Sequence, residues 1–188
     1  MTRLFIVLAA AAAVVGCAGG PVTSQSEFGS APVAVSLSED AAGPITAATP
    51  YSAQSLSGLF PGFKFDTVRT MDDGRVVNFL AGFDEDGFQA FQVEGNASRR
   101  AITAVHVVGP AGAGPRGERV GMTYADVGGR GMSCDAGRGQ WTGMAICKRS
   151  GSKISYIFSP EEFSGSSGTL PRGDELANAR IVRMIWEA

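Results

Sequence analysis

Apolar and polar residues alternate along the chain between residues 63 and 108, which is the pattern of half-buried β-strands. Turn-forming sequences rich in Asp, Glu, Asn and Gly interrupt the alternation three times, at residues 72–74, 85–87 and 94–96. Consecutive strands joined by such short turns pair with one another. The pattern therefore predicts an antiparallel meander of four strands, at residues 63–71, 75–83, 88–93 and 101–108.

The second half of the chain carries three more predicted strands. Residues 143–148 and 153–158 form a hairpin around a Ser-Gly turn, and residues 181–186 form the last strand. Short helices are predicted at 52–59 and 174–179, and Thr123 is expected to cap one helical turn. We therefore predict an α+β fold, in which an antiparallel β-sheet (meander plus C-terminal hairpin and strand) packs with one or two short helices.

The predicted core consists of large apolar side chains that share one face of these strands. Its members are Phe63, Phe65, Val77, Phe79, Phe91, Val105, Val107, Ile146, Ile154, Phe158, Ile181 and Ile185.

The N-terminus has the pattern of a secretory signal, with Arg3 before an unbroken apolar run of residues 4–15. A run this short is below the length of about 20 residues that a membrane-spanning helix needs. Val14-Val15-Gly16-Cys17 resembles the bacterial lipobox, which implies cleavage before Cys17 and its lipidation.

We expect residues 1–16 to be a signal peptide and 17–42 a lipidated cysteine with a flexible Gly/Ala/Ser/Pro tether. Residues 43–188 would then form a single periplasmic domain. Ala18 favours the outer membrane, periplasmic face.

Charge and composition exclude some classes of protein and suggest candidate binding residues. The net charge of −2 argues against a nucleic-acid partner, and the hydrophobic content of 44% argues against disorder. Residues 18–94 hold ten acidic and three basic residues, whereas residues 95–155 hold nine basic and three acidic ones. Either the two signs occupy separate faces or they pair in the fold. In the first case, arginines of the basic segment become candidate partner-binding residues, in particular Arg99, Arg100, Arg116 and Arg119.

Two cysteines remain once Cys17 carries lipid. In an oxidising compartment an even number favours a disulfide, here Cys134–Cys147. Two cysteines and a single histidine in the whole chain do not make a tetrahedral metal site, so we predict no metal and no cofactor.

Catalytic motifs are missing from the sequence. His106 is the only histidine and lies in the middle of an apolar strand, where a structural role is expected. An enzyme would need a cleft that brings His106 together with a carboxylate or a serine. We therefore predict that the protein is not an enzyme and has no catalytic residues.

Several segments together resemble the RpoE-regulated lipoprotein family, envelope lipoproteins of Gram-negative bacteria that contain a domain of unknown function. These are residues 43–50, 74–79, 154–159, 170–171 and 181–186, in combination with the Cys134/Cys147 pair. The resemblance implies a compact α+β domain, a lipid anchor and a link to envelope stress. It implies no known activity.

A second resemblance involves the Ser150-Gly151 turn, which is similar to the inhibitory loop of periplasmic lysozyme inhibitors. The tyrosine of that motif is displaced here to Tyr156, and Ile154 takes its place. A simple hairpin turn is the alternative interpretation. We keep Ser150, Gly151 and Lys153 as candidate partner-binding residues.

These observations predict a lipid-anchored, non-catalytic envelope lipoprotein, either a binding or a structural module linked to envelope stress. It would contact the membrane through its anchor and an envelope component through its surface. The alternative is an inhibitor of lysozyme or of another cell-wall hydrolase.

Overall fold

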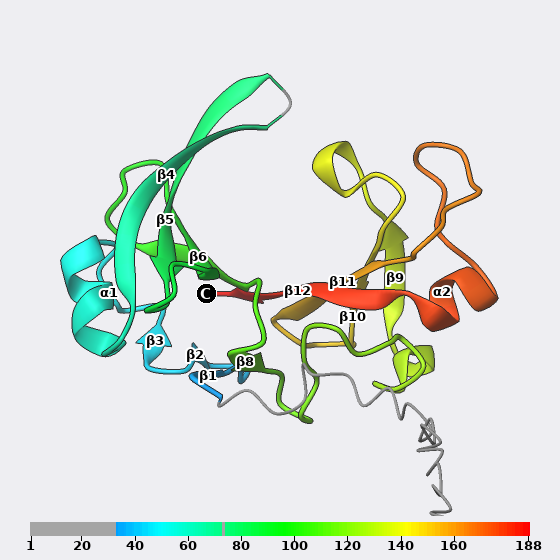
Figure 1. Cartoon of the computed structure of the whole chain (residues 1–188), viewed down its shortest axis with the longest axis horizontal. Helices are drawn as coiled ribbons and strands as arrows, with labels where there is room; N and C mark the ends of the chain where they lie inside the picture. The colour runs from blue at the N-terminus through cyan, green and yellow to red at the C-terminus, as the bar shows by residue number, and fades with distance from the viewer. Residues whose placement is uncertain (1–32, 73) are drawn as a thin grey trace, which may run out of the picture.

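A computed structural model describes residues 33–72 and 74–188 (Figure 1). The main element is one antiparallel sheet of eight strands, with the order β4-β5-β6-β7-β12-β11-β10-β9. Its strands are β4 (Lys64–Asp72), β5 (Arg75–Phe83), β6 (Gln89–Gly95), β7 (Ile102–Val107), β9 (Ser133–Ala136), β10 (Ala145–Lys148), β11 (Ile154–Ser159) and β12 (Arg180–Glu187). The predicted meander and C-terminal hairpin are thereby confirmed.

Two short helices accompany the sheet, as predicted. In α1 (Ala53–Leu59), the hydroxyl of the N-cap residue Ser52 accepts a hydrogen bond from the Ser55 amide, and Leu56 is the buried residue. The second helix is α2 (Asp174–Asn178), which has acidic residues in its first turn. At Thr123 the structure has a single hydrogen-bonded turn, in which the Thr123 hydroxyl accepts from the Asp126 amide over 3.1 Å. The fold is thus mostly antiparallel β-sheet with two short helices and one disulfide.

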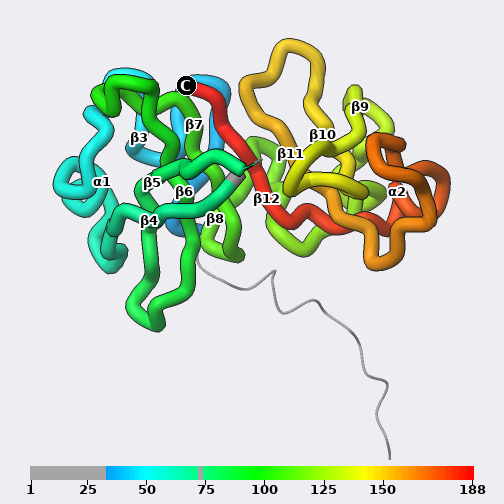
Figure 2. Tube along the Cα trace, turned by 90° about the horizontal axis from the view of Figure 1, so that it is seen from above, coloured from blue at the N-terminus to red at the C-terminus, as the bar shows by residue number. Residues whose placement is uncertain are grey.

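The C-terminal strand β12 joins the two halves of the sheet. It lies between β7 of the meander and β11 of the hairpin, although residues 160–179 separate it from β11 along the chain. Figure 2 shows β12 crossing the middle of the molecule, with the meander on one side and the hairpin on the other. The sheet is therefore completed only after the last residues of the chain are in place.

One face of the sheet carries the core. Phe65, Phe91 and Trp186 are among its buried residues, and Phe60 and Phe63 pack against Phe91 with ring centroids 5.3 and 5.0 Å apart. Eight of the twelve predicted core residues are buried: Phe65, Phe79, Phe91, Val105, Val107, Ile154, Phe158 and Ile181. Of these, Phe79 lies on the opposite face of the sheet and outside the core cluster.

Four predicted core residues are not fully buried. Phe63 is half-buried at the margin of the aromatic cluster, and Val77 is 41% exposed because it lies on a hairpin that extends beyond the sheet. Ile146 and Ile185 point to the opposite face, since Cys147, Met184 and Trp186 take the inward positions of β10 and β12. The prediction chose the wrong face where apolar residues occupy both faces of a strand.

The predicted tether ends too late. The prediction extends it to residue 42, but Val35, Leu37 and Ala42 are buried in the core. Strand β1 (Val35–Ser36) pairs in parallel with β8 (Gly112–Ala113), and β2 (Ala41–Ala42) pairs with β3 (Ile45–Thr46). Because these strands have only two residues each, no alternation marks them in the sequence. The signal peptide 1–16 and Cys17 lie outside the described residues.

The predicted disulfide is confirmed. Cys134 of β9 faces Cys147 of β10 in the register of the two strands, and their Sγ atoms are bonded. Strand β9 is the edge of the sheet and has β10 as its one partner strand, so the disulfide holds the edge in place.

Candidate functional site

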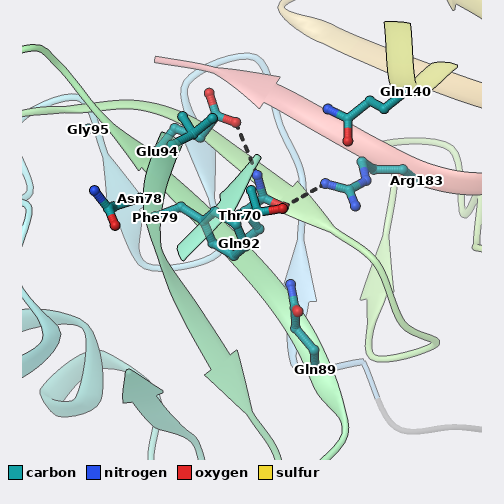
Figure 3. Close-up of a pocket in the computed structure, with 10 residues that line it drawn as sticks. Thr70, Asn78, Phe79, Gln89, Gln92, Glu94, Gly95, Gln140 and Arg183 are labelled. Atoms are coloured by element: carbon teal, nitrogen blue, oxygen red, sulfur yellow. Dashed lines mark hydrogen bonds between the residues drawn. The ribbon is translucent and has the colours of Figure 1, made fainter. Parts of the chain in front are cut away.

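The face of the sheet opposite the core carries a polar groove of about 280 Å³. Its floor is formed by Gln92 and Glu94 of β6 and by Arg183 of β12 (Figure 3). Thr70 and Val77 of the β4–β5 hairpin form one wall, and Gln140 lies on the other side, in the short 3-10 helix η3 (Gly139–Trp141). Asn78, Phe79, Gln89 and Gly95 complete the lining.

The groove exists because the β4–β5 hairpin is longer than the sheet around it. Strand β6 pairs with β5 from Leu80 to Phe83, so residues 75–79 of β5 pair with β4 alone. This free part of the hairpin projects from the sheet in Figure 1. Its residue Val77 lines one wall of the groove. Met71 and Val76 near its tip are 69% and 59% exposed.

Glu94 and Arg183 are connected through two side chains that bridge them in parallel. Gln92 donates from Nε2 to Glu94 Oε1 over 3.1 Å and accepts at Oε1 from Arg183 Nη1 over 2.8 Å. His106 makes the second bridge, with Nε2 at 3.2 Å from Glu94 Oε1 and Nδ1 at 3.0 Å from Arg183 Nη1. One carboxylate oxygen and one guanidinium nitrogen therefore hold both bridges.

This arrangement determines the tautomer of neutral His106. Arginine has only donors, so Nδ1 of His106 accepts the hydrogen bond from Arg183. The ring proton is then on Nε2, where it is donated to Glu94. The register of the strands brings His106 next to the side chains of β6 and β12, because His106 of β7 is paired with Gln92 on one side and with Ile185 on the other. His106 is 6% exposed, and both ring nitrogens are engaged.

The charges of the groove respond to these contacts. The hydrogen bond from His106 holds the pKa of the Glu94 carboxyl below its usual value, and this effect exceeds that of partial burial, which raises it. Burial lowers the pKa of the Arg183 guanidinium, which nevertheless stays charged at neutral pH. The guanidinium also lies 4.9 Å from the ring centroid of Trp141, a cation–π contact that connects β12 to η3.

The structure does not bring the predicted partner-binding residues into one cluster. Arg99 and Arg100 are exposed in the β6–β7 turn, where Arg99 has a positive φ of 53°. Arg119 is half-buried in the loop after β8. Arg116, Ser150 and Gly151 line a second cavity of about 390 Å³, together with Glu39, Pro115, Arg149, Ser152 and Tyr156.

The Ser-Gly turn is bonded to another part of the same chain. The Glu39 carboxylate accepts hydrogen bonds from the Ser152 hydroxyl over 2.7 Å and from the Lys153 amide over 2.6 Å. The backbone carbonyl of Glu39 also accepts from Trp186 Nε1. The turn thus serves as an internal contact between the N-terminal segment and the β10–β11 hairpin.

Two residues of the basic segment contact carboxylates from other parts of the chain. Lys148 lies 2.9 Å from Glu187, and the backbone of Lys153 is bonded to Glu39. Within the part of the chain that the structure describes, no group of three or more His, Cys, Asp or Glu residues is placed to hold a metal ion. In the same part, no helix has the length and hydropathy needed to cross a bilayer.

Sequence reasoning did not identify the residues that line the groove as site candidates, and of the network at its floor it considered only His106. Gln92 and Glu94 do carry a signal, since they are polar positions that alternate with the buried Phe91 and Val93 of β6. Arg183 also stands out in the apolar run 181–186. Gln140 lies in a loop region without periodicity, so no pattern could have connected it with β6.

Comparison with known proteins gives a consistent family. The sequence profile described as "Protein of unknown function (DUF1131)" matches residues 22–188. A relative from Escherichia coli (strain K12), described as the uncharacterized protein YfeY, is 27% identical over 153 residues, which are 80% of this chain and 78% of the relative. The crystal structure of the uncharacterized protein yfeY from Escherichia coli is similar, with a TM-score of 0.64 and 25% identity. The similarity covers 82% of this chain and 99% of that one.

Proposed function

This chain belongs to the DUF1131 family of proteins of unknown function, and from that premise we propose that it is a lipid-anchored, non-catalytic binding protein of the bacterial envelope. The groove on the open face of the sheet is its binding site. The resemblance to RpoE-regulated lipoproteins supports a role in the response to envelope stress.

Two features support the envelope location. The sequence begins with a signal-like segment that leads to Cys17 in a lipobox-like context. The Cys134–Cys147 disulfide is of the kind that persists in oxidising compartments such as the periplasm. We place the protein at the periplasmic face of the outer membrane, held there by lipid on Cys17.

The doubly bridged pair of Glu94 and Arg183 is the observation that carries the binding role. Two opposite charges, both partly shielded from water, are fixed at the floor of a groove by Gln92 and His106. Pre-oriented polar groups of this kind determine how a ligand is placed. Both ring nitrogens of His106 are engaged by Glu94 and Arg183, so neither nitrogen is free to act as a general base. This supports a site for binding rather than catalysis.

The binding role is tested by filling the groove. Val77 lines it, whereas the neighbouring Val76 does not. We expect Val77→Trp to abolish cosedimentation of the purified chain with peptidoglycan sacculi, and Val76→Trp to preserve it. If both variants bind sacculi like the wild type, the groove is not the binding site. If the wild type itself does not cosediment, a cell-wall ligand is excluded.

The anchor is tested separately, by labelling cells with palmitate. Cys17→Ser should remove the label and leave unprocessed precursor. Normal labelling of this variant would contradict the lipid anchor.

Inhibition of lysozyme or another cell-wall hydrolase receives less support. The Ser-Gly turn on which that alternative rests is bonded to Glu39 through Ser152 and Lys153. A titration against a panel of lysozymes tests it, and dose-dependent inhibition by the wild type would make it the leading function.

A further inference from the structure

We propose that the groove recognises a short zwitterionic peptide, with the free amino group on Glu94 and the free carboxylate on Arg183. This inference rests on the proposed function of the groove as a binding site, and it names the chemical class of the ligand. Its basis is the set of polar groups that the Glu94–Gln92/His106–Arg183 network leaves unused.

Glu94 and Arg183 each keep hydrogen-bonding atoms that the network does not use. Both bridges end on Oε1 of Glu94, and among the described residues no hydrogen bond reaches its Oε2. The Glu94 side chain is 45% exposed, so this acceptor is accessible. On Arg183 both bridges start from Nη1, and no hydrogen bond within the described ranges uses Nη2 or Nε. A guanidinium binds a carboxylate best through two such N–H groups.

A ligand with a single charge fits this pair poorly. An anion at Arg183 would come close to the Glu94 carboxylate, and a cation at Glu94 would come close to the Arg183 guanidinium. Because the network fixes both side chains, neither can move away from a like charge. A zwitterion satisfies both charges at once, which makes the floor of the groove selective.

The remaining lining suits amide groups and small side chains. Gln89 and Gln140 present carboxamides, each of which both donates and accepts hydrogen bonds, as a peptide bond does. Val77 and Phe79 supply an apolar wall. The cavity of about 280 Å³ is just below the usual range for pockets of drug-sized ligands, about 300–1,000 Å³. The ligand is therefore a peptide of two or three residues and not a folded protein.

The test is isothermal titration of the purified full chain, in detergent, with the tripeptide Ala-Ala-Ala. The same peptide with an acetylated N-terminus, and again with an amidated C-terminus, removes one charge at a time. We expect the free tripeptide to bind, and each blocked form to bind about 10- to 100-fold more weakly, as the loss of one charged hydrogen bond predicts.

Variants assign each end of the peptide. Glu94→Gln should bind the free and the acetylated peptides equally, and Arg183→Gln should bind the free and the amidated peptides equally. Matched controls are Glu162→Gln and Arg172→Gln, two exposed residues outside the groove lining, which should preserve both preferences. If Arg183→Gln does not fold, Arg183→Lys replaces it and should keep a weakened preference for the free carboxylate.

Three results would overturn the inference. These are no binding of the free tripeptide at millimolar concentration, equal binding of free and blocked peptides, or groove-dependent binding of peptide-free sugar oligomers. If the peptides fail while Val77→Trp still abolishes sacculus binding, the groove remains the binding site and only the ligand class is wrong. If Val77→Trp leaves sacculus binding unchanged, the proposed function itself fails.

Discussion

Glu39 and Ser152 are 113 residues apart in the chain, yet their side chains share a hydrogen bond of 2.7 Å. The same carboxylate accepts from the Lys153 amide, so a residue of the N-terminal segment fastens the β10–β11 turn. This contact makes residues 35–42 part of the fold and provides the first prediction.

Glu39→Gln should lower the free energy of unfolding by about 1 kcal/mol at pH 7, because the amide has one acceptor oxygen for two donors. Solvent screening keeps the effect this small. The Lys153 and Ser152 hydrogen bonds hold the pKa of Glu39 below its ordinary value of 4.5. Its contribution is therefore complete above pH 4.5 and is lost as pH falls through the lowered folded-state pKa. Urea unfolding at pH 7 and pH 3 measures this, with the exposed Glu162→Gln as control. Equal stability of Glu39→Gln and wild type at pH 7 would refute the prediction.

The second prediction concerns the bridge through His106. Without it, the pKa of Glu94 should rise toward its ordinary value of 4.5, because the hydrogen bond from His106 is the largest cause of its depression. NMR titration of the Glu94 carboxyl in His106→Phe measures this. His106→Gln should restore most of the depression, since a carboxamide can bridge the two charges as Gln92 does. An unchanged Glu94 pKa in His106→Phe would show that the bridge does not act on the carboxylate.

Glu118 and Arg149 supply a third prediction. Glu118 is 2% exposed, and its Oε1 lies 3.9 Å from Arg149 Nη2. Removing one member of a buried pair leaves an uncompensated charge, so Glu118→Ala should cost on the order of 3 kcal/mol in urea unfolding. The double variant Glu118→Gln/Arg149→Met removes both charges and should recover part of the loss. A double variant less stable than Glu118→Ala would contradict the role of the unpaired charge.

Tyr156 reports on the same buried carboxylate. Burial raises the pKa of the Tyr156 phenol, and the charge of Glu118 raises it further. In Glu118→Gln we expect that pKa to move down toward its ordinary value of 10. Ultraviolet titration of the phenol checks the shift, and an unchanged titration would exclude an electrostatic effect of Glu118 on Tyr156.

The disulfide provides the fifth prediction. The double variant Cys134→Ala/Cys147→Ala should lose about 3 kcal/mol of stability, the loop-closure value for a cross-link of this span. Hydrogen exchange should show the loss of protection concentrated in the edge strand β9, while β5 and β6 keep theirs, because β9 pairs with β10 alone. Uniform loss of protection across the sheet would instead indicate that the disulfide stabilises the whole domain.

Local sequence patterns were sufficient where neighbouring strands pair. The turns after Met71 and Phe83 define hairpins whose strands meet through contacts a few residues apart, so alternation and turn residues could predict them. The Cys134–Cys147 pair belongs to the same class, because both cysteines come from adjacent strands. Patterns failed where both faces of a strand are apolar, as at Ile146 and Ile185, or where a strand has two residues, as at Val35.

The sequence by itself therefore determined the strand-rich architecture, the hairpins, the two helices and the disulfide, since each depends on residues close in the chain or on a count of two cysteines. Only the tertiary structure decided the groove. Arg183 meets Gln92 and His106 because β12 inserts between β7 and β11, and Gln140 faces them across the open side of the sheet. Such contacts bring together residues up to 91 positions apart. These contacts stabilise the fold only after distant parts of the chain have come together, so no local pattern of polarity predicts them.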